Sequence, residues 1–482
     1  MKVKRFKVST LSMGLAKLSA SSTSVKGISK VIQSESGVMK LDAQTFKDLE
    51  IFKSETGGPS LFDFCNYTRN QQGSEVLRKR MERPWSDPFH IKNTQESITF
   101  IISQRQSFDQ LPSFVTTEIV EDYFHSSLPL AGDNFFEFGI GILEIRFGDL
   151  RSYGKILRGV GAACELIRAL QNIVHLPGLS STCGELSPLL EEMRELLLHP
   201  GFTKLPDKET WNMNFWTIMR IDQVFRLYEQ PALNRLLELV YEIDALVSMA
   251  DATQKHKLVM PEVEEAQLFI KGEHVVHPFL KDAVPNPVAL SQEQRLLFLT
   301  GPNMAGKTTY MRACAIAFYL AHLGMGVPAQ AFRFSPAQYL FSSLSLSDNL
   351  NDGVSYFRAE ALRVKAVAQA VADGYRVVAL MDEPFKGTNI KDALDASREI
   401  LARFATKEGC LFMFSSHLIE LSDQMNATDQ IDCRYFEAGE SGGKLSFEYI
   451  LCSGVSNQRL GMRVLQEEGV FELLNYESNL KS

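Results

Sequence analysis

Residues 301–309 read Gly301-Pro302-Asn303-Met304-Ala305-Gly306-Lys307-Thr308-Thr309, and this stretch indicates both a fold and a chemistry. It matches G-x-x-x-x-G-K-[ST], the pattern of the P-loops that bind nucleotide phosphates. An apolar run at 296–299 precedes it, and a helix-like stretch at 311–321 follows it. This order of strand, loop and helix favours a P-loop over the alternative, a glycine-rich turn without a ligand. We therefore expect the loop to bind a nucleoside triphosphate.

The residues of this loop have distinct expected roles. Glycines let backbone N–H groups surround phosphate oxygens, and the N-terminus of the following helix adds a favourable dipole. Lys307 would reach the β- and γ-phosphates, and the Thr308 hydroxyl would bind Mg²⁺. The sequence thus predicts a nucleotide and Mg²⁺ as cofactors, with all of 301–309 contributing to the nucleotide site.

An acidic pair follows a second apolar run. Residues 377–381 are all apolar, as in a strand that is buried on both faces of a parallel sheet, and Asp382 and Glu383 come directly after them. Asp382 would hold Mg²⁺ through water, and Glu383 would orient or deprotonate the attacking water. The alternative is that these acids cap a following helix. Beside a P-loop, the pair favours hydrolysis of the nucleotide over a small-molecule kinase activity.

A third run, residues 411–416, also reads as a buried strand, and His417 follows it. A histidine there can hydrogen-bond the γ-phosphate or the attacking water. A lone histidine is often structural, but ligands of open α/β sheets bind at the carboxyl ends of the strands. We therefore expect Lys307, Glu383 and His417 to be the catalytic residues.

Together these motifs, with residues 384–388 after the acidic pair, resemble the ATPase domain of the MutS family, a branch of the ABC-type ATPases. Residues 347–357 resemble the segment that crosses the dimer interface in that family. The resemblance implies ATP as the nucleotide, a homodimer through the ATPase domains, and contact of Ser355 with the γ-phosphate bound by the partner. The sequence Leu-Ser-Gly-Gly-Gln does not occur, which argues against a transporter or an SMC-type ATPase.

The resemblance extends beyond these motifs. Residues 41–88 are similar to the opening of the MutS core domain, and residues 454–461 are similar to the closing glycine-containing segment of the family's ATPase. Only 40 residues precede the core motif, so we expect the mismatch-reading domain to be lacking. Residues 135–137 fit its Phe-x-Glu motif, but they lie inside the core region and are interpreted as incidental. The clamp, a nuclease-like tail and an aromatic residue near 283–287 for stacking on adenine are also expected to be missing.

Composition agrees with a large ATPase outside the membrane. The chain has 482 residues, 45% of them apolar, enough for two or three cores. No apolar run approaches the roughly 18 residues of a membrane span. Seven scattered cysteines without a C-x-x-C pair indicate reduced thiols and a cytoplasmic location.

Charge is distributed unevenly along the chain. Residues 1–40 contain eight Lys or Arg and one acid, so they carry +7, and the other 442 residues carry −15 of the total of −8. The basic segment is rich in Ser and Thr and is expected to be disordered. It could bind nucleic acid phosphates or an acidic membrane surface, act as an organelle presequence, or have no partner. An acidic body is not what a strong sequence-independent DNA binder needs.

Residues 90–265 read as mainly helical. The clearest helix has apolar residues at alternating gaps of three and four: Leu233, Leu236, Val240, Ile243, Val247 and Ala250. This spacing predicts helix-on-helix packing and suits a lever. We therefore expect a basic tail (1–40), a mainly helical core and lever domain (41–265), and an α/β ABC-type P-loop ATPase domain (266–482).

Two functions remain open at this point. The first is a MutS-like DNA-binding ATPase, in which ATP binding and hydrolysis in a dimer are coupled to its grip on double-stranded DNA that is branched, distorted or mismatched. The second is an ATP-regulated dimeric switch that acts through protein partners without specific DNA binding. The core motif and the basic tail favour the first function, and the acidic body and the expected lack of the clamp favour the second.

Overall fold

The computed structural model describes residues 37–474, apart from several short segments. Asn303, Ser355 and the Phe-x-Glu match at 135–137 lie outside the described residues, as does nearly all of the basic tail. The segments left out within 37–474 are 56, 129–137, 141–142, 144–149, 176–183, 207–209, 303, 346–355, 418, 422–428, 442–443, 457 and 459–460. From Met39 onward the chain forms one compact unit.

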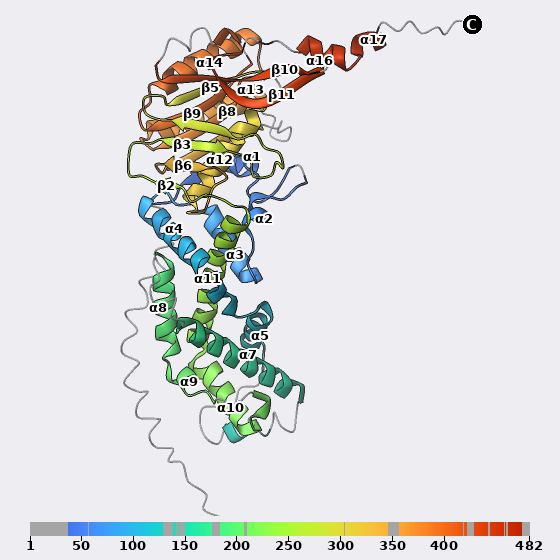
Figure 1. Cartoon of the computed structure of the whole chain (residues 1–482). Coiled ribbons are helices and arrows are strands. Elements are labelled where there is room, and N and C mark those ends of the chain that lie inside the picture. Colours follow the sequence, from blue (N-terminus) through green and yellow to red (C-terminus); the bar gives the residue numbers. More distant parts are fainter. Residues whose placement is uncertain are drawn as a thin grey trace, which may run out of the picture. The chain divides into compact units, whose positions relative to one another are not determined.

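The N-terminal region is mainly helical, as the sequence predicts, and an α/β region follows it (Figure 1). No helix in the described part of the chain is both long and apolar enough to cross a lipid bilayer. The N-terminal helices are α1 (Ala43–Asp48), α2 (Leu61–Cys65), α3 (Gln71–Glu82), α4 (Pro88–Ser103), α5 (Phe114–His125), α7 (Leu150–Val174), α8 (Leu186–Leu197), α9 (Pro200–Thr203), α10 (Phe215–Gln223) and α11 (Gln230–Lys255).

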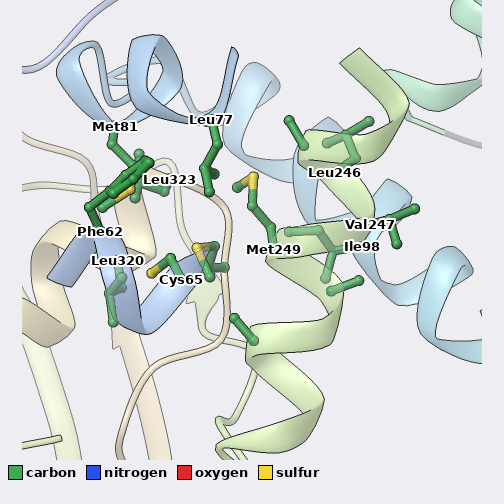
Figure 2. Packing of buried hydrophobic residues seen from close by; sticks show 14 of the residues in the cluster. Phe62, Cys65, Leu77, Met81, Ile98, Leu246, Val247, Met249, Leu320 and Leu323 are labelled. Carbon is green, nitrogen blue, oxygen red and sulfur yellow. The ribbon is translucent and has the colours of Figure 1, made fainter. Parts of the chain in front are cut away.

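Helix α11 carries the predicted apolar stripe. All six stripe residues, from Leu233 to Ala250, are buried, and α11 packs against α3, α4 and α8. A proline in its first turn is tolerated because the N–H group that it lacks has no partner within a helix at that position. Figure 2 shows apolar side chains from α2, α3, α4 and α11 in one cluster with Leu320 and Leu323, from the end of helix α12 (Lys307–His322).

The α/β region contains two sheets. The larger has the strand order β1-β7-β8-β9-β5-β10-β11, parallel except for the last strand, and the smaller has the order β2-β6-β3-β4. The strands are β1 (Lys40–Leu41), β2 (Glu262–Val263), β3 (Ile270–Val275), β4 (Asn286–Leu290), β5 (Leu296–Thr300), β6 (Ala331–Phe334), β7 (Tyr339–Ser343), β8 (Val377–Asp382), β9 (Cys410–Ser415), β10 (Ile431–Ser441) and β11 (Lys444–Ser453). The helices of this region are α12 (Lys307–His322), α13 (Tyr356–Ala372), α14 (Ile390–Ala405), α16 (Gly461–Glu467) and α17 (Val470–Leu474).

The central strands are covered on both faces. Every residue of β5 is buried, and its side chains alternate between two clusters, with Leu297 and Leu299 in one and Leu296 and Phe298 in the other. This explains why the three predicted strands read as continuous apolar runs. Because β8, β9 and β5 are adjacent and parallel, their carboxyl ends meet at one edge, and the loops that follow them are brought together there.

The N-terminal motif lies along the larger sheet. Strand β1 pairs in parallel with β7, with Leu41 opposite Leu340. The buried carboxylate of Asp48 accepts hydrogen bonds from the backbone N–H of Leu344 (2.7 Å) and from the hydroxyl groups of Ser342 (3.0 Å) and Ser345 (2.7 Å). Residues that were expected to open the helical domain thus complete one edge of the α/β sheet. The domain boundary near residue 265 stays a prediction.

Candidate nucleotide-binding site

Two glycines give the loop after β5 its conformation. Gly301 has φ 137°, and a Cβ atom there would lie 2.7 Å from the backbone oxygen of Phe436 on β10. Gly306 has φ 100° and is the N-cap residue of α12. Both values lie in the region that side chains disfavour. The loop therefore needs glycine at the two positions that the sequence pattern requires.

The Lys307 side chain lies inside this loop and is 4% exposed. Its ammonium group donates to the backbone oxygens of Gly301 (2.9 Å) and Pro302 (3.2 Å). It also lies 3.3 Å from Oε1 of Glu383. A buried ammonium needs such oxygen partners, and phosphate oxygens of a nucleotide offer the same kind of partner.

Asp382, at the end of β8, connects two hydroxyl groups from neighbouring elements. The Thr308 hydroxyl, in the first turn of α12, donates to one carboxylate oxygen, and the Ser415 hydroxyl, at the end of β9, donates to the other. One hydroxyl and one carboxylate fit Mg²⁺, because this ion usually keeps several waters and adds one or two carboxylates and nucleotide phosphates. Thr308 and Asp382 are therefore the residues that could hold the ion.

Three cationic or polar side chains surround the carboxylate of Glu383. Besides Lys307, the ammonium of Lys386 lies 2.7 Å from Oε2, and Nδ1 of His417 lies 3.4 Å from the same oxygen. Burial raises the pKa of Glu383, but the hydrogen bonds from His417 and Lys386 and the charge of Lys307 outweigh it and lower the pKa well below its usual range. Glu383 is therefore ionised at neutral pH.

The backbone after β8 adopts two left-handed conformations at residues other than glycine. Glu383 has φ 47° and Phe385 has φ 69°, and each costs about 1–2 kcal/mol. Nearby contacts stabilise both residues. The backbone N–H of Glu383 donates to the backbone oxygen and the hydroxyl of Ser415, both at 3.1 Å, and the buried Phe385 ring packs 5.9 Å from the ring of Phe357.

A pocket of about 720 Å³ is lined by five of these residues: Lys307, Thr308, Asp382, Glu383 and Lys386. Its lining also includes the apolar or aromatic residues Leu280, Val284 and Tyr449. The Tyr449 ring lies beside Gly306, and Asn286 accepts the N–H of Leu451 (2.7 Å) and donates to the backbone oxygen of Tyr449 (2.8 Å). The pocket therefore combines a polar region suited to phosphates with an apolar wall that contains an aromatic ring.

Most of the predicted site residues meet at this pocket. Residues 301–309 form its loop, apart from Asn303, which lies outside the described residues. Met304 is exposed and, together with Thr309, lines the pocket, whereas the Ala305 side chain is buried. His417 is 55% exposed and reaches Glu383. The structure does not test the expected contact of Ser355, which also lies outside the described residues.

Sequence reasoning missed three residues of the site. Ser415 and Lys386 belong to the quoted motifs, and their positions, two residues before His417 and three after Glu383, could have indicated them. Tyr449 has no local signal, because contacts with distant segments bring it to the loop: the pairing of β10 with β5 and of β11 with β10, and the hydrogen bonds of Asn286. It supplies an aromatic ring that was expected to be missing from the segment around 283–287.

A lysine, a threonine and an acidic pair thus lie around one pocket at the ends of the parallel strands of the α/β region. Residues 297–475 match the family model of MutS domain V, which is the ATPase domain of the MutS family. The matched range contains the loop after β5, Asp382, Glu383, His417 and Tyr449. The match therefore supports a MutS-family ATPase domain in this part of the chain, as the resemblance of its motifs implied.

Proposed function

We propose that this pocket binds ATP with Mg²⁺ and hydrolyses it. The observation that carries the proposal is the convergence of Lys307, Thr308, Asp382 and Glu383 from two segments on one pocket in a MutS domain V. ATP phosphates would replace the backbone oxygens that Lys307 now contacts. Thr308 and Asp382 would hold the ion, which supplies positive charge next to the β- and γ-phosphates.

Glu383 would orient the attacking water in this reaction. Its low pKa makes it a weak base, so we infer that it accepts a hydrogen bond from water before it takes up a proton. His417 contacts Glu383 and would respond to the γ-phosphate. Ser355 would reach the nucleotide of a second subunit, which makes hydrolysis depend on a homodimer formed through the ATPase domains.

The activity of the dimer would be coupled to its grip on double-stranded DNA that is branched, distorted or mismatched. Two observations support this: the MutS domain V itself, and the basic segment of residues 1–40, whose charges suit phosphate contacts. The long helix α11 connects the helical region to the strands of the α/β region and is suited to transmit a change at the pocket.

A second function, an ATP-regulated switch for protein partners, is favoured by a different observation. The 442 residues after the basic segment carry −15, which repels DNA, and large apolar side chains are exposed in the helical region. Examples are Phe89 at 63%, Leu198 at 74% and Trp216 at 58%. Such side chains are suited to protein contacts.

The ATPase proposal is tested with Glu383→Gln in the full chain. We expect this variant to bind a fluorescent ATP analogue as tightly as the wild type and to lose at least about 100-fold in turnover, because the amide cannot orient water as a carboxylate does. Glu399→Gln, on the exposed face of α14, is the matched control and should hydrolyse ATP at the wild-type rate. Unchanged turnover in Glu383→Gln would remove Glu383 from its proposed role.

DNA and protein partners are distinguished by equilibrium binding. The purified chain is titrated against fluorescent homoduplex, mismatched, single-stranded and four-way-junction DNA, with and without ATP, across a salt series. Nucleotide-dependent binding to one of these structures that weakens steeply with salt would support the DNA function. Equal and negligible binding to all four would favour the protein switch.

A further inference from the structure

A buried acid outside the expected motifs contacts the loop that follows Glu383. Glu360 lies on α13, is 2% exposed, and is the helix's sole acidic residue. Its two carboxylate oxygens face the backbone N–H groups of Lys386 (3.2 Å) and Gly387 (3.5 Å). Burial raises the pKa of Glu360, although N–H groups of the same loop lower it. Helix α13 thus carries a buried carboxyl group whose hydrogen-bond donors are backbone N–H groups of this loop.

One residue of this loop, Lys386, contacts the carboxylate of Glu383, the proposed catalytic residue. The ammonium group of Lys386 lies 2.7 Å from Oε2 of Glu383, and both residues line the pocket. Between them, Phe385 has φ 69°, a conformation that persists only where surrounding contacts enforce it. The bond to the Lys386 N–H is such a contact, and it fixes the backbone from which the lysine side chain extends.

The helix that carries Glu360 is itself fixed on the sheet. Arg363, one turn later, donates to the backbone oxygen of Ser342 at the end of β7 (2.5 Å) and to the hydroxyl of Thr45 (3.0 Å). It also forms an ion pair with Asp42. Because α13 is bonded to β7 and to the N-terminal motif, the position of the Glu360 carboxylate is set by the sheet rather than by the loop.

We propose that Glu360 is a positioning residue for ATP hydrolysis, which sets the conformation of residues 385–387 and through Lys386 the position of the Glu383 carboxylate. The inference rests on the proposed function, in which Glu383 orients the attacking water. Glu360 itself does not reach the pocket, so it acts on turnover and not on nucleotide contacts. A small displacement of a reacting group is sufficient to reduce a rate by about 100-fold.

The test compares Glu360→Ala and Glu360→Gln with the wild type and with Glu399→Gln as the exposed control. We expect Glu360→Ala to lower kcat about 100-fold and Glu360→Gln about 10-fold, since the amide oxygen still accepts one of the two N–H groups. The Kd of a fluorescent ATP analogue should change less than about threefold in both. Hydrogen exchange followed by mass spectrometry should show faster exchange at residues 385–387 in both variants, with α12 and β8 unchanged.

The outcomes separate this inference from the function on which it rests. If the wild type hydrolyses ATP, Glu383→Gln does not, and both Glu360 variants keep the wild-type kcat, the positioning role is wrong and the ATPase stands. If kcat falls, Kd rises and hydrogen exchange becomes faster throughout the protein, Glu360 is merely structural and the inference is overturned. If Glu383→Gln retains turnover, the ATPase proposal itself fails. Should Glu360→Ala not fold, Glu360→Gln decides by the same criteria.

Discussion

Helix α11 and the pocket of the α/β region are built in opposite ways. In α11, apolar side chains at regular spacing are buried against neighbouring helices, and no residue has a positive φ. At the pocket, four residues other than glycine have positive φ: Met304, Glu383, Phe385 and Tyr449. Three of them line the pocket, and the fourth follows Glu383. The comparison indicates that the proposed site of chemistry holds four of the seven positive-φ residues other than glycine in the described part of the chain, whereas α11 holds none.

The largest expected effect comes from Lys307→Met. A methionine fills the same space without charge, so we expect turnover to fall by a factor of about 100–1,000 or more and ATP affinity to fall with it. The free energy of unfolding should change little, because Glu383 keeps Lys386 and His417 as partners. Steady-state hydrolysis and urea unfolding on the same preparation check both parts. A large loss of stability would contradict the contrast between site and scaffold.

Leu236→Ala in α11 should show the reverse pattern. Leu236 is fully buried, and its truncation leaves a cavity that typically costs about 2–5 kcal/mol. We expect a lower free energy of unfolding with unchanged kcat below the unfolding temperature. Leu198→Ala, at a site that is 74% exposed, is the control and should have almost no effect. If Leu236→Ala lowered kcat in the folded protein, α11 would take part in turnover and the two regions would not be separable.

A smaller effect concerns pH and the far end of α12. His322 is fully buried; Nδ1 lies 2.7 Å from the Phe318 backbone oxygen, and Nε2 accepts the N–H of Ala337. Burial lowers its pKa to about 3, while the bond to Phe318 raises it. The unfolded chain therefore takes up a proton first as pH falls below about 6.5. Stability should decrease by up to about 1.4 kcal/mol per pH unit from there toward pH 3.

Replacing His322 with Gln removes this titration and keeps one donor and one acceptor. Urea unfolding between pH 7 and pH 4 then gives the free energy of unfolding as a function of pH. We expect a shallower slope for the variant than for the wild type, by the equivalent of about one proton taken up on unfolding, whatever the absolute stability of the variant. Identical slopes for His322→Gln and wild type would mean that His322 titrates normally.

Local sequence was sufficient for the parts of the fold that have regular spacing. The stripe from Leu233 to Ala250 predicts α11, because a helix that is buried on one face has apolar residues at gaps of three and four. The three apolar runs predict the three central strands, because a strand that is buried on both faces is apolar throughout. The two glycines of the loop after β5 could also be predicted, since the positive φ values at Gly301 and Gly306 disfavour other residues. These predictions depend only on neighbours along the chain.

The remaining parts depend on contacts between distant segments. Nothing near Tyr449 indicates that its ring reaches Gly306, because strand pairings and the contacts of Asn286 with β11 decide this. Glu360 had a faint signal, as the lone acid of its helix, but its partners at 386 and 387 follow from the packing of α13. The pairing of residues 40–41 with β7 likewise could not be predicted, since a strand of two residues is too short to show an alternating pattern.

That short pairing has a consequence for how the protein is made. Asp48 and its partner Leu344 are 296 residues apart in sequence, so the first residues of the folded unit leave the ribosome long before the strand that they accompany. Until β7 is synthesised, the carboxylate of Asp48 has no partner there and the β1 segment has no sheet to join. Contacts of such long sequence separation slow folding. The larger sheet of the α/β region is therefore completed at one edge by residues that are synthesised about 300 residues before the strand that they pair with.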